Sequence, residues 1–394
     1  MSSASIASAT ATNFAADNPS NSLLQLEAFD IPSSRNVHGN AFPLGLRPTA
    51  STENPSIEDV TAHIRELADQ GIIQSLLNKQ PDKRLDGVIL FRGLSVTDAA
   101  AFSAFTESFK FPKHYQEIGL AGKRSIVAGN VKTANEEPPD VKFYYHTEYG
   151  RSADYPDILF FYSEIVPEQG LRSSFSACRS GQTPILSSVE LCDRLEKDLP
   201  QFYHDLTTKG IIGRQYFPAP NTDEAKTIGW NWKDSYGFDI QPNDSLDVQH
   251  SKVASVLASK LQAKAEWQSN GALHVLQTLP AIRRVKSTNK PTFFNGFAGV
   301  YGRGRDNGAL KPPYRGADGG VHLPTTYGDG SEIPIGYLER LLEIQDEIGF
   351  LTPWQPGDVA LIDNQTAQHA RTPWVGKRSL LVSLWKGHER LGAM

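Results

Sequence analysis

Short segments of β-branched and aromatic residues, separated by stretches with helical spacing of apolar residues, predict a mixed α/β chain with a mainly β core. Loops rich in Gly and Pro interrupt this pattern at residues 300–330. The combination favours a distorted double-stranded β-helix, a jelly-roll or cupin-like fold, with flanking helices and inserted lid loops. Such a core presents its open end to ligands, so we expect the functional site there.

Strands are predicted where apolar and aromatic residues cluster between turn residues. Residues 87–93 form an apolar run bounded by glycines, and residues 157–162 form a second buried run. A Pro-Gly-Asp turn opens an apolar strand that leads toward His369, and a short hairpin-like connection then leads to a strand at 379–385. Further strand candidates are 141–146, 211–217, 273–279 and 292–295.

Helices are predicted from capping residues and from apolar residues at helical spacing. Residues 56–79 start with a helix-forming composition, and residues 96–98 precede a helix that extends to about Phe109. The segments 186–206, 247–268 and 334–348 also have largely helical patterns. Residues 302–305 read Gly-Arg-Gly-Arg, which superficially suggests phosphate or RNA binding. They lack the preceding strand and following helix of a phosphate cradle, so we expect a loop.

The length of 394 residues is compatible with one elaborated β-sandwich domain. We expect a single domain over residues 22–394, with the β-helix core in about 85–388. Residues 1–21 consist mainly of Ser, Ala, Thr and Asn, without Lys or Arg and without a long apolar core. This composition fits neither a secretory nor a mitochondrial leader, and we expect a disordered tail.

Charge and cysteine content limit the possible partners and compartment. The net charge of −5 gives no electrostatic footprint for nucleic acid or for an anionic membrane. No apolar run approaches transmembrane length. The sequence contains two cysteines, Cys178 and Cys192, which could form one disulfide. So small a number of cysteines favours a reducing compartment. We therefore expect a cytoplasmic protein with neither nucleic acid nor a membrane as a partner, and the oligomeric state stays open.

The pattern that carries chemistry is His146-x-Glu148 followed far downstream by His369. Side chains two positions apart on a strand point the same way, so a strand through Glu148 would bring imidazole and carboxylate together. A third ligand from another strand would complete one face of an octahedron and leave three positions open, as iron(II) oxygenases require. The alternative is a core histidine that is hydrogen-bonded to a carbonyl group, which is the usual role of a lone His.

A cation follows the distant histidine at the start of the next predicted strand. Arg378 lies nine residues after His369 and can face a carboxylate held on the metal, because its planar fork pairs with carboxylates in bidentate fashion. A surface salt bridge is the alternative role for Arg378. Arg371 could support the metal ligands or meet a substrate carboxylate, and the sequence leaves both roles open.

Four separated motifs resemble, in order, those of the taurine dioxygenase and clavaminate synthase-like family. They lie at 146–148, 180–185, 354–364 and 369–378. The resemblance implies iron(II) bound by His146, Glu148 and His369, with 2-oxoglutarate as cosubstrate and dioxygen as oxidant. It also implies that Arg378 grips the distal carboxylate of 2-oxoglutarate and that Thr183 helps to hold it, although Thr before Pro is also ordinary turn chemistry. Two departures are Ser180-Gly181-Gln182, where the family usually has Gly-Gly-Glu, and a Glu ligand, which is typical of the clavaminate synthase branch.

The activity implied by this resemblance is activation of a C–H bond in a small amino-acid-like or carboxylate substrate, with release of succinate and CO2. Hydroxylation, desaturation and oxidative cyclisation all stay open, and secondary metabolism is the expected context. Two other classes also stay open. One is an oxygenase that acts on a peptide or protein side chain, which the lack of zinc-finger spacing and of a basic surface disfavours. The other is a non-catalytic small-molecule binding relative, which the intact ligand set disfavours.

Overall fold

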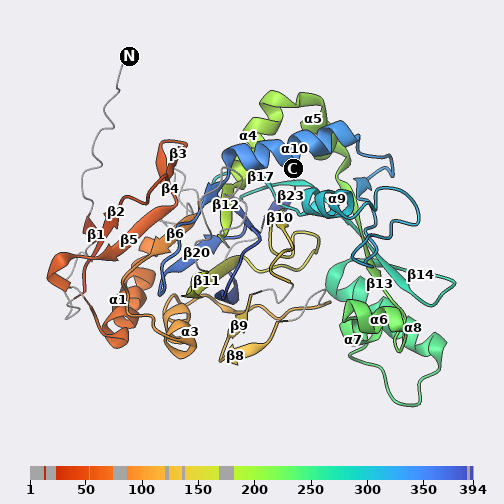
Figure 1. The fold of residues 1–394 in the computed structure, drawn as a ribbon, viewed down its shortest axis with the longest axis horizontal. Helices are drawn as coiled ribbons and strands as arrows, with labels where there is room; N and C mark the ends of the chain where they lie inside the picture. The colour runs from red at the N-terminus through yellow and green to blue at the C-terminus, as the bar shows by residue number, and fades with distance from the viewer. Residues whose placement is uncertain are drawn as a thin grey trace.

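The computed structural model describes residues 13–14, 24–52, 54–73, 87–119, 124–134, 138–167, 182–387 and 391–393. In this part of the chain two β-sheets pack against each other, and helices cover their outer faces (Figure 1). The protein therefore has a mixed α/β fold with a sheet-rich core, as its sequence predicts.

The larger sheet, with ten strands among the described residues, is built around β11 (Ile158–Ile165). β11 lies antiparallel between β20 (Val359–Asp363) and β22 (Ser379–Lys386), which confirms the predicted strands in these regions. β6 (Val88–Phe91) pairs antiparallel with β20 and parallel with β5 (Leu44–Pro48). The remaining strands are β1 (Asn13–Phe14), β2 (Leu26–Phe29), β7 (Lys113–His114), β8 (Ile126–Ala128) and β9 (Val131–Thr133).

The smaller sheet carries the strands nearest to the site. Its order is β10 (Phe143–His146), β21 (Ala367–Arg371), β12 (Pro184–Ser187) and β19 (Phe350–Leu351). Because side chains alternate along a strand, Leu159 and Phe161 of β11 face inward. They share one buried apolar cluster with Ile185 of β12 and Ala367 of β21. This cluster joins the two sheets, so residues on the inner faces of β10 and β21 lie between them.

Two helices cover the outer face of the larger sheet. α1 (Ile57–Asp69) and α3 (Ala99–Glu107) pack on the alternate β11 side chains, among them Phe160. Each helix begins at a residue whose side chain accepts a hydrogen bond from the first turn, Ser56 for α1 and Asp98 for α3. The helix predicted to extend to about Phe109 is confirmed by α3. The helix predicted over 56–79 ends early, at Asp69, and a turn follows in which Gly71 has a left-handed backbone (φ 71°); residues 74–79 lie outside the described residues.

Four helices cover the outer face of the smaller sheet: α4 (Ser188–Asp198), α5 (Pro200–Lys209), α9 (Phe297–Asp306) and α10 (Ile335–Ile348). The helix predicted from residue 186 is wrong at its start, because 186–187 belong to β12 and Ser187 caps α4. The loop predicted at 302–305 is also wrong, because these residues lie in α9. A Cβ at Gly302 would lie 2.7 Å from the Tyr144 ring, so glycine allows α9 to approach β10 closely.

A further unit follows α5 in the chain and is drawn in green and teal in Figure 1. Its sheet contains β13 (Ile211–Phe217), β14 (Lys264–Trp267), β15 (Leu273–Leu279) and β18 (Thr326–Tyr327). The helices α6 (Asp223–Ile228), α7 (Trp232–Tyr236) and α8 (Leu246–Leu261) belong to the same unit. The predicted helix at 247–268 ends early, because Gln262 adopts a left-handed conformation (φ 52°) and the chain then enters β14. Trp232 and Tyr236 are buried in the core of this unit, where they pack as aromatic residues usually do.

Three short strands, β16 (Ile282–Arg284), β17 (Pro291–Phe293) and β23 (Gly392–Ala393), form a separate sheet. β17 confirms the strand predicted near residue 292, although it ends at Phe293. 

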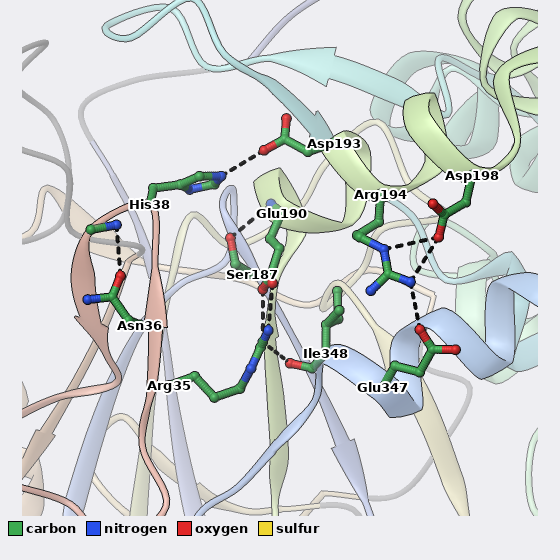
Figure 2. A network of polar contacts seen from close by, with 11 residues as sticks. Arg35, Asn36, His38, Ser187, Glu190, Asp193, Arg194, Asp198, Glu347 and Ile348 are labelled. Atoms are coloured by element: carbon green, nitrogen blue, oxygen red, sulfur yellow. Dashed lines mark hydrogen bonds and ion pairs between the residues drawn. The ribbon is translucent and has the colours of Figure 1, made fainter. Parts of the chain in front are cut away.

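The N-terminal hairpin of β3 (Arg35–Val37) and β4 (Asn40–Phe42) is tied to helices of the smaller sheet (Figure 2). The Arg35 guanidinium lies 2.6 Å from a Glu190 carboxylate oxygen of α4 and also donates to the carbonyl of Ile348. His38 lies 2.7 Å from Asp193 of the same helix. These polar contacts fix the hairpin across the end of α10.

Other predictions fall at the margins of the described residues. Asn13 and Phe14 pair with β2, whereas the rest of the expected tail, 1–12 and 15–21, lies outside them. Cys178 also lies outside, and the Cys192 thiol is free and buried in α4. Among helices within the described ranges, none combines the length and the apolar character needed to cross a bilayer.

Candidate metal centre

His146 and His369 face each other across the β10–β21 ladder. They are register partners, and their ring centroids lie 4.4 Å apart. The register shifts between His146 and Phe143, whose partner is Arg371. Two residues of β10, Tyr144 and Tyr145, therefore stand opposite one residue of β21, Ala370. Such a bulge changes the direction of the following side chain. The His369 ring also packs edge-on against Phe161 of the larger sheet at 5.0 Å, which places both imidazoles in the space between the sheets.

Glu148 does not lie on the strand, contrary to the prediction that the strand continues through it. β10 ends at His146, and Glu148 lies in the following turn, where Tyr149 has a left-handed backbone (φ 55°). The turn is held by Asn364, which follows β20. Its Oδ1 accepts a hydrogen bond from the Glu148 amide at 2.9 Å, and its Nδ2 donates to the Glu148 carbonyl at 3.0 Å. Strand alternation therefore does not orient this carboxylate; a side-chain clamp on its backbone does.

Three donor atoms converge at this point. Glu148 Oε2 lies 3.6 Å from Nε2 of His146 and 3.4 Å from Nε2 of His369. The ligand atoms of all three residues lie within 4.8 Å of one another. Glu148 and His369 are buried, and the side chain of His146 is 29% exposed. Two imidazole nitrogens and one carboxylate oxygen on the same side of a space form the donor set that suits iron(II) with open coordination positions.

The hydrogen bonds and charges favour the metal-binding forms of these residues. His146 Nδ1 lies 2.8 Å from the Tyr144 carbonyl, which can only accept, so Nδ1 carries the proton and Nε2 has the free lone pair. Burial, and secondarily the neighbouring His146, lowers the pKa of His369 to about 4. Burial raises the pKa of Glu148, but the Arg124 guanidinium, and then the two neighbouring histidines, outweigh it and hold this pKa well below its usual range. At neutral pH His369 therefore presents a neutral imidazole and Glu148 presents a carboxylate.

Arg124 is a site residue that sequence reasoning missed. It lies just before β8, and its Nη2 is 2.7 Å from Glu148 Oε1, the carboxylate oxygen that does not face the histidines. Its Nη1 is 3.0 Å from Glu117 Oε1. Neither residue belongs to a recognisable motif, and only the folded chain brings them beside Glu148.

Thr183 and Arg378 lie together, as the sequence predicts. Thr183 immediately precedes β12, two positions from Ile185, the register partner of His369. The Thr183 hydroxyl lies 3.4 Å from Arg378 Nη2 and accepts a hydrogen bond from Trp354 Nε1 at 3.1 Å. Burial, and then repulsion by Arg371, lowers the pKa of Arg378 to about 10. An anion bound here would relieve both effects.

Arg371 supports the backbone that leads into β10. Its Nη2 donates to the carbonyls of Pro138 and Val141, each at 2.9 Å. Its guanidinium also lies over the rings of Phe143 at 4.2 Å and Trp374 at 4.8 Å. These contacts give Arg371 a structural role close to the site.

The chain is similar to several known proteins. The pattern of the family described as taurine catabolism dioxygenase TauD, TfdA family matches residues 65–385. A clavaminate synthase-like protein of Arabidopsis thaliana is 30% identical, covering 90% of this chain and 97% of its own length. The dapdiamide synthesis protein DdaC of Enterobacter agglomerans is 24% identical, covering 85% of this chain and 89% of its own. A crystal structure of a putative α-ketoglutarate-dependent taurine dioxygenase from Burkholderia xenovorans has 15% identity and a TM-score of 0.44, covering 92% of this chain and 93% of that one.

The chain therefore belongs to the TauD/TfdA family. It is an oxidoreductase, a dioxygenase that depends on iron(II) and 2-oxoglutarate and uses dioxygen.

Proposed function

We propose that His146, Glu148 and His369 are the iron ligands of this dioxygenase. The observation that carries the proposal is the convergence of two imidazole Nε2 atoms and one carboxylate oxygen within 4.8 Å. The orientation of His146 supports the proposal. Its Nδ1 donates a hydrogen bond to the carbonyl of Tyr144, so Nε2 is the nitrogen with a lone pair for the metal. Bound iron(II) would activate dioxygen, the oxidant, with two electrons from 2-oxoglutarate, which leaves as succinate and CO2, and with two from the substrate C–H bond. The protein supplies position and charge.

We infer that Arg378 and Thr183 bind the distal carboxylate of 2-oxoglutarate. A guanidinium and a hydroxyl that lie 3.4 Å apart can donate to the same carboxylate. Trp354 fixes the hydroxyl by donating to it, so the hydrogen of Thr183 is free to point toward a bound anion. Arg378 is partly buried and Thr183 is buried, so little water screens the pair and the attraction is stronger than at the surface.

The primary substrate in this proposal is a small amino-acid-like or carboxylate molecule, and the outcome is hydroxylation, desaturation or oxidative cyclisation. Kinship with a clavaminate synthase-like protein and with a protein of dapdiamide synthesis supports a small-molecule substrate. We further propose one oxygenase domain over residues 22–394, with a distorted double-stranded β-helix core in about 85–388. The two facing sheets, with the three donor atoms between them, support this architecture.

The test is succinate release by the iron-loaded protein with 2-oxoglutarate over a panel of free amino acids and small carboxylates. We expect one compound to raise succinate formation well above the substrate-free rate. The mass of that compound should increase by one oxygen atom if it is hydroxylated, or decrease by two hydrogen atoms if it is desaturated or cyclised. Stimulation by peptides but by none of the free compounds would instead assign a peptide or protein substrate. If the protein binds both iron and 2-oxoglutarate but no compound of either panel stimulates turnover, a non-catalytic relative would be favoured.

A further inference from the structure

The two oxygens of the Glu148 carboxylate have different surroundings. Oε2 faces Nε2 of both His146 and His369, at 3.6 and 3.4 Å. Oε1 faces away from them and accepts a charge-assisted hydrogen bond from Arg124 at 2.7 Å. Only one oxygen is thus directed at the point where the three donors meet.

Arg124 is itself fixed by a second carboxylate. Glu117 Oε1 lies 3.0 Å from Arg124 Nη1 and accepts a hydrogen bond from the Tyr149 hydroxyl at 3.0 Å, while Glu117 Oε2 pairs with Lys132. Glu117 is 4% exposed and Arg124 is 15% exposed at the side chain. The two acids and two bases balance in charge, so no net charge is buried in the group, and each guanidinium nitrogen named here has a defined acceptor.

The number of carboxylate oxygens on the metal decides how many coordination positions remain. Two histidines and one carboxylate oxygen leave three of six positions open, enough for a two-atom chelate and one gas molecule. A carboxylate that binds through both oxygens takes one of these positions. Glu has one more rotatable bond than Asp, so it reaches this second mode more easily unless its other oxygen is held.

We propose that Arg124 is a positioning residue that keeps Glu148 bound to iron through Oε2 alone and so preserves the position for dioxygen. The inference rests on the iron-ligand assignment proposed above. Glu117 holds the Arg124 guanidinium in place, and Lys132 and Tyr149 in turn hold the Glu117 carboxylate. 

The experiment uses nitric oxide as a probe of the open position in anaerobic protein loaded with iron(II) and 2-oxoglutarate. The iron–nitrosyl EPR signal is titrated in the wild type and in Arg124→Gln, and iron affinity is measured in parallel. We expect Arg124→Gln to keep iron affinity within about threefold, because Glu148 gains a second oxygen for the metal. We expect its affinity for nitric oxide to fall by roughly ten- to hundredfold, the size of effect usual for residues that support metal ligands.

Three further variants separate positioning from general stability. Arg124→Lys should recover part of the nitric oxide affinity, because one donor still reaches Oε1. Glu117→Gln should shift it in the same direction as Arg124→Gln but less. Arg35→Gln is the matched control, because it removes another partly buried arginine–glutamate pair, at 2.6 Å, on the outer helix α4. It should leave both affinities unchanged.

Unchanged nitric oxide affinity in Arg124→Gln would overturn the proposal. An equal loss of iron and nitric oxide binding would also overturn it, because it would show that the three ligands no longer hold the metal. Should Arg124→Gln fail to fold, Glu117→Gln and Tyr149→Phe carry the test, and no shift in either would contradict it. A wild-type protein that binds neither iron nor 2-oxoglutarate would overturn the ligand assignment itself.

Discussion

Asn364 and Glu148 lie 216 positions apart in the sequence, yet the Asn364 side chain makes hydrogen bonds with both the amide and the carbonyl of Glu148. The same Nδ2 also donates to the carbonyl of Pro156 at 2.7 Å. One amide group thus joins the end of β20, the turn after β10 and the segment before β11. Because the Glu148 backbone is fixed, its carboxylate needs only its own side-chain rotations to meet the histidines.

Replacement of Asn364 by Ala should weaken both the fold and the metal site. Three buried hydrogen bonds disappear, and unsatisfied backbone groups cost roughly 1–3 kcal/mol each, partly relieved by water. We expect the free energy of unfolding to fall by about 2–4 kcal/mol and iron(II) affinity to fall by about tenfold or more. Urea unfolding and an anaerobic iron titration measure the two effects. A stable variant with normal iron affinity would show that the turn holds without this clamp.

Arg378→Ala should raise the Michaelis constant for 2-oxoglutarate by more than about tenfold, because it leaves a buried carboxylate unpaired at a cost of roughly 2–5 kcal/mol. Arg378→Lys should recover only part of the loss, since an ammonium group cannot reproduce the bidentate fork. Arg371→Ala is the nearby comparison. Its partners are the backbone carbonyls of Pro138 and Val141, so it should lower thermal stability more than 2-oxoglutarate affinity. The reverse result would mean that the cosubstrate arginine is Arg371.

Thr183→Val tests the second donor of the cosubstrate site. Valine keeps the shape but removes the hydroxyl that Trp354 orients, so one hydrogen bond of about 1 kcal/mol is lost. We expect the dissociation constant of 2-oxoglutarate to rise by roughly fivefold, measured by calorimetry with iron in place. Trp354→Phe should give a smaller change in the same direction. An unchanged constant in Thr183→Val would remove Thr183 from the binding site.

Stability should fall as the pH is lowered through the range in which histidines protonate. Burial of His63 in α1 lowers its pKa, only partly opposed by Glu66, so the folded state favours the neutral ring. Below about pH 6.5 the unfolded chain binds a proton at this histidine more readily than the folded protein does. The contribution of His63 to the free energy of unfolding is therefore complete above about pH 6.5 and is lost as the pH falls below it. His63→Gln should reduce the difference in the free energy of unfolding between about pH 7.5 and about pH 5. An identical pH dependence in both proteins would contradict the assignment to His63.

The strands and the two histidines that we propose as iron ligands could be located from the sequence because they depend on local patterns. Apolar runs between turn residues located β6, β11 and β22 closely. His369 lies on β21, immediately after the turn that ends β20.

The parts that failed depend on contacts between distant segments. The sequence predicts Glu148 on a strand, but Glu148 lies in a turn that is held by the Asn364 side chain. The spacing of residues in the sequence does not reveal this contact between distant positions. The sequence predicts a loop at 302–305 because the flanking strand and helix of a phosphate cradle are missing there. These residues lie in α9 instead, where the missing Cβ of Gly302 leaves space for the Tyr144 ring. Arg124 and Glu117 carry no motif, and they become part of the site only through tertiary pairing.

The assignment of the iron ligands is tested most directly by anaerobic titration of iron(II) and 2-oxoglutarate into the wild type, His369→Ala and the matched surface variant His204→Ala. The visible charge-transfer band of the 2-oxoglutarate chelate on iron reports a complete site. We predict the band in the wild type and in His204→Ala, and its loss in His369→Ala together with a fall in iron affinity of at least about tenfold, while circular dichroism shows the fold retained. A full band with unchanged iron affinity in His369→Ala would contradict the assignment.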